Sequence, residues 1–345
     1  MKSLLFVAPK SLEIVEKQVR SIKDDELLIQ IGACGVCGTD LHIFNGEASA
    51  KLNTVLGHEF SGTIVEKGKG CSEFSIGEKI AVDPNIYCGK CSYCKNGQIH
   101  FCKNHRALGV TEDGGFSEYT IVPLSQAYHL PKDISLNLAA FAEPLSCCLR
   151  GIDRSEIKAG ENVIIIGGGS IGLIMLQLSV ISGAARLIMI EPNEERRILA
   201  QRLGAQFVFS PDDENLLQKI KELTNGSSGT IIECVGNSSA AALSIQISNK
   251  GSKVILFGLA PFNESIKLNL QEIFKKGLTI KSSFLNPFTF DRAVELIINN
   301  KLQLESFPVS LLSLEEIQET ISSKVKKSKS LKYQFNNQNN RRTYD

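Results

Sequence analysis

One short segment carries four cysteines whose spacing suits a metal ion. Cys88, Cys91, Cys94 and Cys102 are separated by two, two and seven residues. Zinc prefers four soft donors in a tetrahedron, and two-residue gaps let neighbouring thiolates point at one centre. Because four thiolates leave no coordination position open, we predict a structural zinc site. Free or disulfide-bonded cysteines, or a zinc ribbon that binds nucleic acid, are the alternatives.

A second, dispersed group could hold a metal ion that keeps one position open. It combines the thiol of Cys37, the imidazole of His58 and the carboxylates of Glu59 and Glu143. One thiolate, one imidazole and one carboxylate form a plausible three-ligand set with room for water or substrate. A single His or Glu in a globular protein is usually a surface group or a satisfied core group. The gaps are long, so spacing alone leaves both interpretations open.

A glycine-rich loop follows an apolar strand and opens an apolar helix, which is the context that a dinucleotide site requires. The loop spans residues 167–172, with Ser170 and Ile171 before its last glycine. Gly167 suits the tight turn, Gly169 lets the backbone approach a pyrophosphate, and Gly172 lets helix and strand pack closely. The pyrophosphate would then lie at the helix N-terminus.

The next predicted strand ends at an acidic residue, Glu191. A carboxylate there accepts hydrogen bonds from the adenosine ribose hydroxyls and repels a 2′-phosphate, which favours NAD over NADP. Arg196 and Arg197 follow closely and could accommodate a phosphate, so NADP is the less favoured alternative. A solvated acid at the start of a helix is the structural alternative for Glu191.

The sequence pattern divides the chain into two parts. Up to about residue 145, short β-like runs are broken by Gly, Pro and Asn, which indicates a compact barrel-like unit. From about residue 150, buried strands such as 162–166 and 186–190 alternate with helices such as 170–182 and 192–203. This alternation predicts an α/β fold with a parallel, doubly wound sheet. Residues 326–345 are expected to form a last strand and a solvated tail.

The composition excludes several classes of partner. Lys plus Arg number 38 and Asp plus Glu number 37 in 345 residues, so the net charge of +1 supplies no field for nucleic acid or an anionic membrane. No run approaches the roughly 18 apolar residues of a membrane span, and the first apolar run is too short for a signal peptide. We therefore expect a cytoplasmic protein without nucleic-acid or membrane partners. Five further cysteines are interpreted as small buried hydrophobic residues: Cys34, Cys71, Cys147, Cys148 and Cys234.

Taken together, the motifs resemble the zinc-containing medium-chain dehydrogenase/reductase family. Gly57-His58-Glu59, the four cysteines and the glycine loop occur in the order and spacing of that family. The resemblance spans residues 2–333. It implies a GroES-like β-barrel catalytic domain at 1–148, to which 287–345 return, and a Rossmann domain for NAD at 149–286.

The resemblance also implies two zinc ions per subunit, one structural and one catalytic. Cys37, His58 and Glu59 would hold the catalytic zinc, with Glu143 at the remaining ligand position of the family. Whether Glu59 or Glu143 ligates directly stays open. Thr39 and His42 are implied as a proton relay, against the simpler interpretations of a helix-start Thr and a surface His.

The substrate that the resemblance favours is a polyol. Glu143-Pro144-Leu145 is similar to the sorbitol, arabinitol and threonine dehydrogenases, and residues 82–85 and 283–288 look most like the polyol subgroup, especially the pentitol dehydrogenases. A polyol of the sorbitol, L-iditol or arabinitol type, or its phosphate, is the implied substrate, and L-threonine and a simple secondary alcohol are alternatives. A non-catalytic zinc-binding structural module is the alternative from another class. Members of the family are often dimers or tetramers, so a homodimer or homotetramer is expected.

Overall fold

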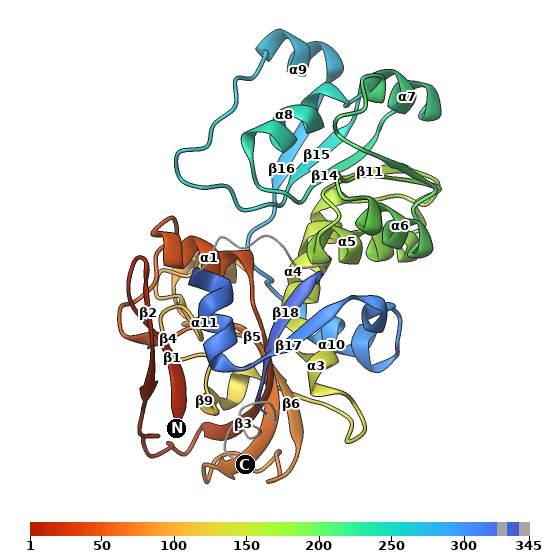
Figure 1. The fold of residues 1–345 in the computed structure, drawn as a ribbon. Coiled ribbons are helices and arrows are strands. Elements are labelled where there is room, and N and C mark those ends of the chain that lie inside the picture. The colour runs from red at the N-terminus through yellow and green to blue at the C-terminus, as the bar shows by residue number, and fades with distance from the viewer. Residues whose placement is uncertain (323–329, 338–345) are drawn as a thin grey trace. The chain divides into compact units, whose positions relative to one another are not determined.

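The computed structural model describes residues 1–322 and 330–337. The chain forms two compact units. Unit 1 contains Met1–Ser146 and Pro287–Asp345, and unit 2 contains Cys147–Asn286. Unit 2 is thus inserted into the sequence of unit 1, with boundaries close to residues 148 and 287. Figure 1 shows the elements of both units. No helix in the described part of the chain is both long and apolar enough to cross a bilayer.

Unit 1 is built mainly of antiparallel strands. A small sheet has the order β2-β1-β4, from β2 (Ser11–Glu16), β1 (Lys2–Ala8) and β4 (Thr54–Val55). The main sheet runs β10-β6-β5-β3-β18-β17, and β9 also pairs with β3. Its strands are β10 (Ala127–His129), β6 (Lys79–Val82), β5 (Glu59–Lys67), β3 (Glu26–Gly35), β18 (Lys332–Asn336), β17 (Val309–Leu312) and β9 (Tyr119–Pro123). β7 (Asn85–Ile86) pairs with β8 (Arg106–Ala107).

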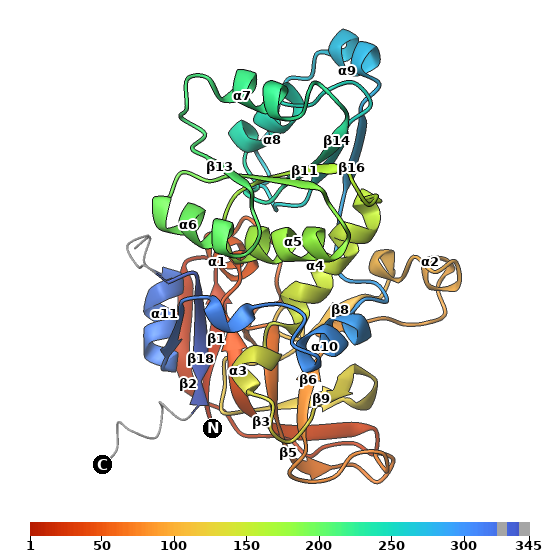
Figure 2. The ribbon, with the colours of Figure 1, turned by 90° about the vertical axis from the view of Figure 1, so that its right-hand side faces the viewer.

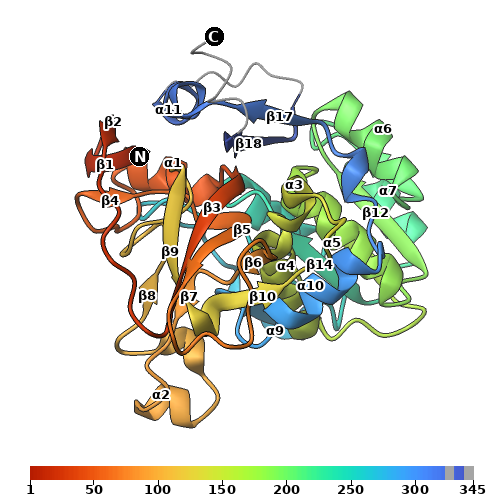
Figure 3. The same ribbon diagram turned by 90° about the horizontal axis from the view of Figure 1, so that it is seen from below.

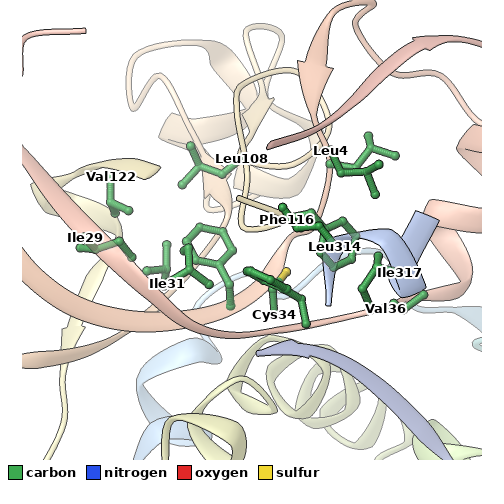
Figure 4. Packing of buried hydrophobic residues seen from close by; sticks show 14 of the residues in the cluster. Leu4, Ile29, Ile31, Cys34, Val36, Leu108, Phe116, Val122, Leu314 and Ile317 are labelled. Carbon is green, nitrogen blue, oxygen red and sulfur yellow. The ribbon is translucent and has the colours of Figure 1, made fainter. Parts of the chain in front are cut away.

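The core of unit 1 lies between these strands and a helix from the end of the chain. Alternate residues of β3 point inward, so Leu27, Ile29 and Ile31 are fully buried. Helix α11 (Leu314–Ser322) adds Leu314 and Ile317, which lie one helical turn apart on the same face. Figure 4 shows both α11 residues in one cluster with Ile29 and Ile31.

The other helices of unit 1 are short. They are α1 (Gly38–Asn45), α2 (Ser92–Lys95), α3 (Leu136–Ala139) and α10 (Phe290–Ile298), with 3-10 turns η1 (Ile99–Phe101), η2 (Leu124–Gln126) and η3 (Leu304–Ser306). Helix α4 (Ala142–Ser155) begins in unit 1 and ends in unit 2. Figure 3 shows that α2 stands apart from the sheets of unit 1.

Unit 2 contains a six-stranded parallel sheet of order β13-β12-β11-β14-β15-β16. The strands are β13 (Phe207–Phe209), β12 (Arg186–Ile190), β11 (Asn162–Ile166), β14 (Gly229–Glu233), β15 (Lys253–Leu256) and β16 (Thr279–Ser282). Chain order reverses between β11 and β14, the point where such sheets bind dinucleotides. Helices α5 (Ser170–Ile181) and α6 (Glu194–Arg202) cover one face, and α7 (Leu216–Leu223) and α8 (Ser238–Gln246) the other (Figure 2). Helix α9 (Leu270–Lys276) precedes β16. The predicted doubly wound sheet is confirmed.

Some element boundaries differ from the prediction. The strands at 162–166 and 186–190 have the predicted bounds, but α6 begins at Glu194 rather than at residue 192. The cause is Asn193, whose side chain accepts a hydrogen bond from the Arg196 N–H and caps the helix. The last strand, β18, begins at Lys332, and the predicted polar tail lies mostly outside the described residues.

Candidate active site

Three predicted metal ligands come together in unit 1. One ligand atom each from Cys37, His58 and Glu59 lies within 4.8 Å of the other two. Cys37 is the N-cap of α1, and Glu59 is the first residue of β5. The turn before β5 depends on Gly57, whose φ is +90° and where a Cβ would lie 2.6 Å from the Cys34 sulfur. A glycine is therefore required to bring His58 to this position.

Asp40 links two of these ligands. Its side chain is fully buried. One carboxylate oxygen accepts a hydrogen bond of 2.8 Å from the Cys37 N–H, which closes the capping box of α1. The other oxygen lies 3.6 Å from His58 Nδ1. Because Nδ1 is turned towards Asp40, Nε2 is the His58 nitrogen left for a metal ion.

The electrostatics of this group suit a cation. Burial alone lowers the pKa of the His58 imidazole, but the charges of Asp40 and Cys37 outweigh burial and raise that pKa well above its ordinary value. The negative charges that would hold a proton on His58 attract a metal ion as well. The buried atoms Asp40 Oδ1 and His58 Nδ1 also lack a hydrogen bond. The donor set and its charge therefore fit a zinc ion.

Glu59 has a counter-ion from the far end of the sequence. Lys332 of β18 forms an ion pair with Glu59 Oε2, and both side chains are buried. Strand β3 lies between β5 and β18, and its Gly35 is opposite Glu59; a Cβ on Gly35 would overlap the Glu59 carboxylate. Burial lowers the pKa of Lys332, but the carboxylates of Glu59 and Glu143 and the Cys37 thiolate raise it overall. Lys332 therefore stays charged.

Glu143 lies outside the three-donor group. It is in the first turn of α4 and is buried. Its charge acts on Lys332, but its oxygens are not among the ligand atoms within 4.8 Å of one another. As the structure stands, Glu59 is the carboxylate of the group.

The two predicted relay residues lie on α1. Thr39 Oγ1 is 3.6 Å from the Cys37 sulfur, in the first turn of the helix. His42 lies in the last turn, and its Nδ1 is 2.8 Å from an oxygen of Glu47. Thr39 and His42 therefore lie three residues apart on the helix that Cys37 caps.

The four cysteines of the α2 segment also lie within 4.8 Å of one another. Backbone N–H groups of Cys94 and Lys103 lower the pKa of Cys91 to about 6. Desolvation and the hydrogen bonds that the Cys94 thiol donates to the neighbouring cysteine sulfurs raise the pKa of Cys94 to about 12. Four thiolates repel one another without a cation, so this cluster also fits a zinc ion, with no position left for a substrate.

The glycine loop and Glu191 come together in unit 2. Gly167 has a φ of +99°, and a Cβ on Gly172 would lie 1.8 Å from the Gly167 carbonyl oxygen, so α5 packs directly on the loop. Gly169 is the N-cap of α5, and a Cβ there would meet no atom within 4 Å. The N–H groups of Ser170 and the residues after it begin the helix and suit a phosphate.

The Glu191 carboxylate holds the loop from the neighbouring strand. It is buried and accepts hydrogen bonds from the N–H groups of Gly168 (2.6 Å) and Asn193 (2.9 Å). A carboxylate has about four lone-pair positions, so both oxygens can still accept ribose hydroxyls. Arg197 donates to the carbonyl oxygens of Glu191 and Pro192. The backbone N–H of Arg196 donates a hydrogen bond to the side chain of Asn193, which caps α6.

Sequence reasoning missed Asp40, Lys332 and Glu47. Asp40 had a local signal, because an acid three residues after the N-cap is the pattern of a capping box. Glu47 had no local signal, since its contact with His42 depends on the turn that ends α1. Lys332 could not be found, because its pairing with Glu59 depends on the strand order β5-β3-β18.

Comparison with known proteins agrees with both units. Residues 23–132 match the family model of the alcohol dehydrogenase GroES-like domain, and residues 170–299 match that of the zinc-binding dehydrogenases. The chain is 35% identical to an L-threonine 3-dehydrogenase of Pyrococcus furiosus, over 85% of this chain and 86% of that one. It is 29% identical to D-arabinitol dehydrogenase 1 of Uromyces fabae, over 93% of both chains.

A solved structure supports the same assignment. A zinc-binding dehydrogenase from Sinorhizobium meliloti 1021, solved bound to NADP, is 34% identical with a TM-score of 0.93, covering 97% of this chain and 98% of that one. The GroES-like and Rossmann folds predicted from the motifs are thereby confirmed. The chain belongs to the zinc-binding alcohol dehydrogenases with a GroES-like domain, and it is an oxidoreductase that uses zinc and a nicotinamide dinucleotide.

Proposed function

We propose that this enzyme oxidises a polyol at a secondary hydroxyl and uses NAD as the hydride acceptor. The observation that carries the proposal is the group of Cys37, His58 and Glu59, whose three donors leave a zinc position open for a substrate oxygen. Zinc, when bound, lowers the pKa of an alcohol hydroxyl, and the nicotinamide ring takes the hydride.

The protein's own groups bind, orient and move the proton. Cys37, His58 and Glu59 hold the zinc, and Asp40 orients His58 through Nδ1. The Thr39 hydroxyl takes up the proton of the substrate hydroxyl as it gives up its own proton, and His42, whose side chain is 21% exposed, releases a proton to solvent. Lys332 keeps the buried site from accumulating negative charge.

The preference for a polyol over threonine is supported by the groups near Glu59. β6 is antiparallel to β5, so the residues after β6 lie beside the start of β5. There, Asn85 donates to the Asp83 carboxylate (3.3 Å) and its oxygen contacts His105 Nε2 (2.9 Å). Asp83 and Asn85 are polar groups without positive charge, and both are buried beside the start of β5. The carboxylate of threonine would be bound best by a positively charged side chain. Lys332 lies beside Cys37, His58 and Glu59, but it is already paired with Glu59.

The preference for NAD is supported by Glu191. Its buried carboxylate lies against the glycine loop and would repel a 2′-phosphate. Arg197 uses its guanidinium on backbone carbonyls, which leaves Arg196 as the candidate partner of a phosphate. Because the relative from Sinorhizobium meliloti was solved bound to NADP, the cofactor preference is best tested by comparing kcat/KM with NAD and with NADP.

A substrate screen tests the proposal. Pentitols, hexitols, their phosphates, simple secondary alcohols and L-threonine are each added with NAD and with NADP, and reduction is followed at about 340 nm, where reduced nicotinamide absorbs. We expect the highest kcat/KM for a pentitol or hexitol with NAD. A higher kcat/KM for L-threonine would replace the polyol by the amino acid, and a higher value with NADP would reverse the cofactor preference.

We also infer that the subunits form a homodimer or homotetramer. The support is an exposed apolar surface in unit 2: Leu270 and Phe274 of α9 are 78% and 85% exposed, and Ile280 lies on the edge strand β16. Light scattering on the purified protein should give a mass of two or four chains. A monomer at micromolar concentration would contradict the inference.

A cytoplasmic location is our inference from the cysteines. All ten are free thiols in the structure, and the tightest cluster suits zinc rather than disulfides. Reduced cysteines are typical of the cytosol. Fractionation with an antibody to the native protein would test the location.

A further inference from the structure

A carboxylate just beyond α1 contacts the imidazole of His42. Glu47 Oε2 lies 2.8 Å from His42 Nδ1, and the side chains are 37% and 21% exposed respectively. We propose that Glu47 is a positioning residue that fixes the tautomer and orientation of His42 for proton transfer. The proposal rests on the proposed role of His42 in the relay.

The backbone at the end of α1 presets this contact. Gly46 adopts the left-handed conformation (φ +76°), which reverses the chain after the helix. The N–H groups of Glu47 and Ala48 then both donate to the His42 carbonyl oxygen, at 2.8 and 3.2 Å. Because Glu47 is tied to the backbone of His42, its carboxylate reaches the ring with little loss of chain entropy.

The chemistry of the pair determines the tautomer. An ionised carboxylate can only accept a hydrogen bond, so the proton of a neutral His42 lies on Nδ1. Nε2 then carries a lone pair and can accept a proton, while without Glu47 the ring samples both tautomers and other rotamers. In proton transfer, His42 takes a proton at Nε2, becomes an imidazolium beside the Glu47 carboxylate, and gives one proton to a water molecule. One proton enters and one leaves, and no electrons are exchanged.

A second histidine–glutamate pair in unit 1 provides a matched control. His129 Nδ1 lies 4.0 Å from Glu78 Oε2, and Glu78 is 36% exposed, close to the value for Glu47. His129 is the last residue of β10, and Glu78 directly precedes β6, so this pair is separate from α1. Glu78→Ala therefore removes a similar surface pair without touching the relay.

The experiment compares Glu47→Ala, Glu47→Gln, Glu78→Ala and the parent enzyme by two readouts. Nitrogen-15 NMR of the imidazoles reports the His42 tautomer in the zinc-loaded enzyme without substrate. Steady-state kinetics report kcat and KM for the best alcohol. We expect Nδ1–H in the parent and in Glu78→Ala, and a mixture of tautomers in Glu47→Ala.

The kinetic result should follow the tautomer. We expect kcat of Glu47→Ala to fall roughly tenfold, less than the 10²–10⁴ that a whole proton-transfer group contributes, while KM values change little. Glu47→Gln keeps an acceptor oxygen for Nδ1–H and should restore most of kcat.

Two results would overturn the proposal, and they differ in meaning. If Glu47→Ala keeps both the Nδ1–H tautomer and the parental kcat, Glu47 does not position His42, and the relay is unaffected. If His42→Ala also keeps the parental kcat, the relay itself is absent, and the role given to Glu47 is absent with it.

Discussion

The most informative substitution is Asp40→Asn, because it keeps the shape of the side chain, removes its charge and replaces one acceptor oxygen by an NH₂ donor. Asp40 accepts from the Cys37 N–H with one oxygen and faces His58 Nδ1 with the other. An asparagine has one acceptor oxygen and one NH₂ donor. Whichever way it turns, it loses either the hydrogen bond to Cys37 or the contact with His58.

The expected loss of zinc affinity follows from the loss of one hydrogen-bond acceptor. Leaving one buried donor without its acceptor costs about 1–3 kcal/mol. If that cost falls on the metal-loaded state, zinc affinity drops roughly 5- to 150-fold, since about 1.4 kcal/mol is a factor of ten. Loss of a group that orients a metal-bound histidine typically weakens a site about 10- to 100-fold, which agrees with this range.

The assay is competition for zinc with a chromogenic chelator, which resolves a tight and a weaker zinc in one protein. Asp40→Asn should weaken one zinc and leave the zinc of the four-cysteine cluster unchanged. Glu26→Gln is the control, because Glu26 is also a buried acid of unit 1 but pairs with Arg20. Two zinc ions bound as tightly in Asp40→Asn as in the parent would refute the assignment of Asp40 as the residue that orients His58.

Four further predictions follow from the same geometry. Cys37→Ser should abolish turnover while circular dichroism and the zinc of the cysteine cluster stay unchanged; near-normal rates would exclude the zinc mechanism. Cys91→Ser should lower the melting temperature and lose one zinc, with the chemical step of the remaining folded enzyme preserved; full stability with impaired chemistry would reverse the two roles. Glu191→Ala should weaken NAD more than NADP in fluorescence titrations, and equal losses would mean that Glu191 acts only through its hydrogen bonds to the glycine loop. The Arg20 hydrogen bond lowers the pKa of Glu26 from 4.5 to about 2. The Arg20–Glu26 pair therefore stabilises the fold fully above about pH 5 and progressively less as the pH falls towards 2. The difference in melting temperature between the parent and Arg20→Ala should shrink over that range, and a constant difference would count against a role of the pair in stability.

Much of unit 2 could be predicted because its signals are local. The strands at 162–166 and 186–190 are continuous apolar runs, as strands buried on both faces must be. The start of α6 was misplaced because the capping side chain of Asn193, and not the apolar pattern, decides where the helix begins. The four-cysteine cluster was predictable for the same local reason, since all its ligands lie in one short segment.

The candidate catalytic site was only partly predictable because its partners are distant in sequence. Cys37, His58 and Glu59 were found through motif resemblance, and spacing alone did not group them. Lys332 joins Glu59 only through the order of three strands, which no local pattern encodes. Glu143 was expected beside the zinc ligands, and the structure brings it into electrostatic range of Lys332 but not into the donor group.

The insertion of unit 2 into unit 1 has a consequence for synthesis on the ribosome. Residues 1–146 include all three metal donors, but the strand that carries Lys332 follows unit 2 in the chain. At about 5–20 residues per second, translation needs roughly 10–40 s to pass from residue 146 to residue 332. During this interval the β3 edge that later pairs with β18 is unpaired and the Glu59 carboxylate has no lysine beside it. A nascent chain that recruits zinc early would neutralise that carboxylate before its permanent counter-ion arrives, so metal supply during translation should influence the yield of folded enzyme.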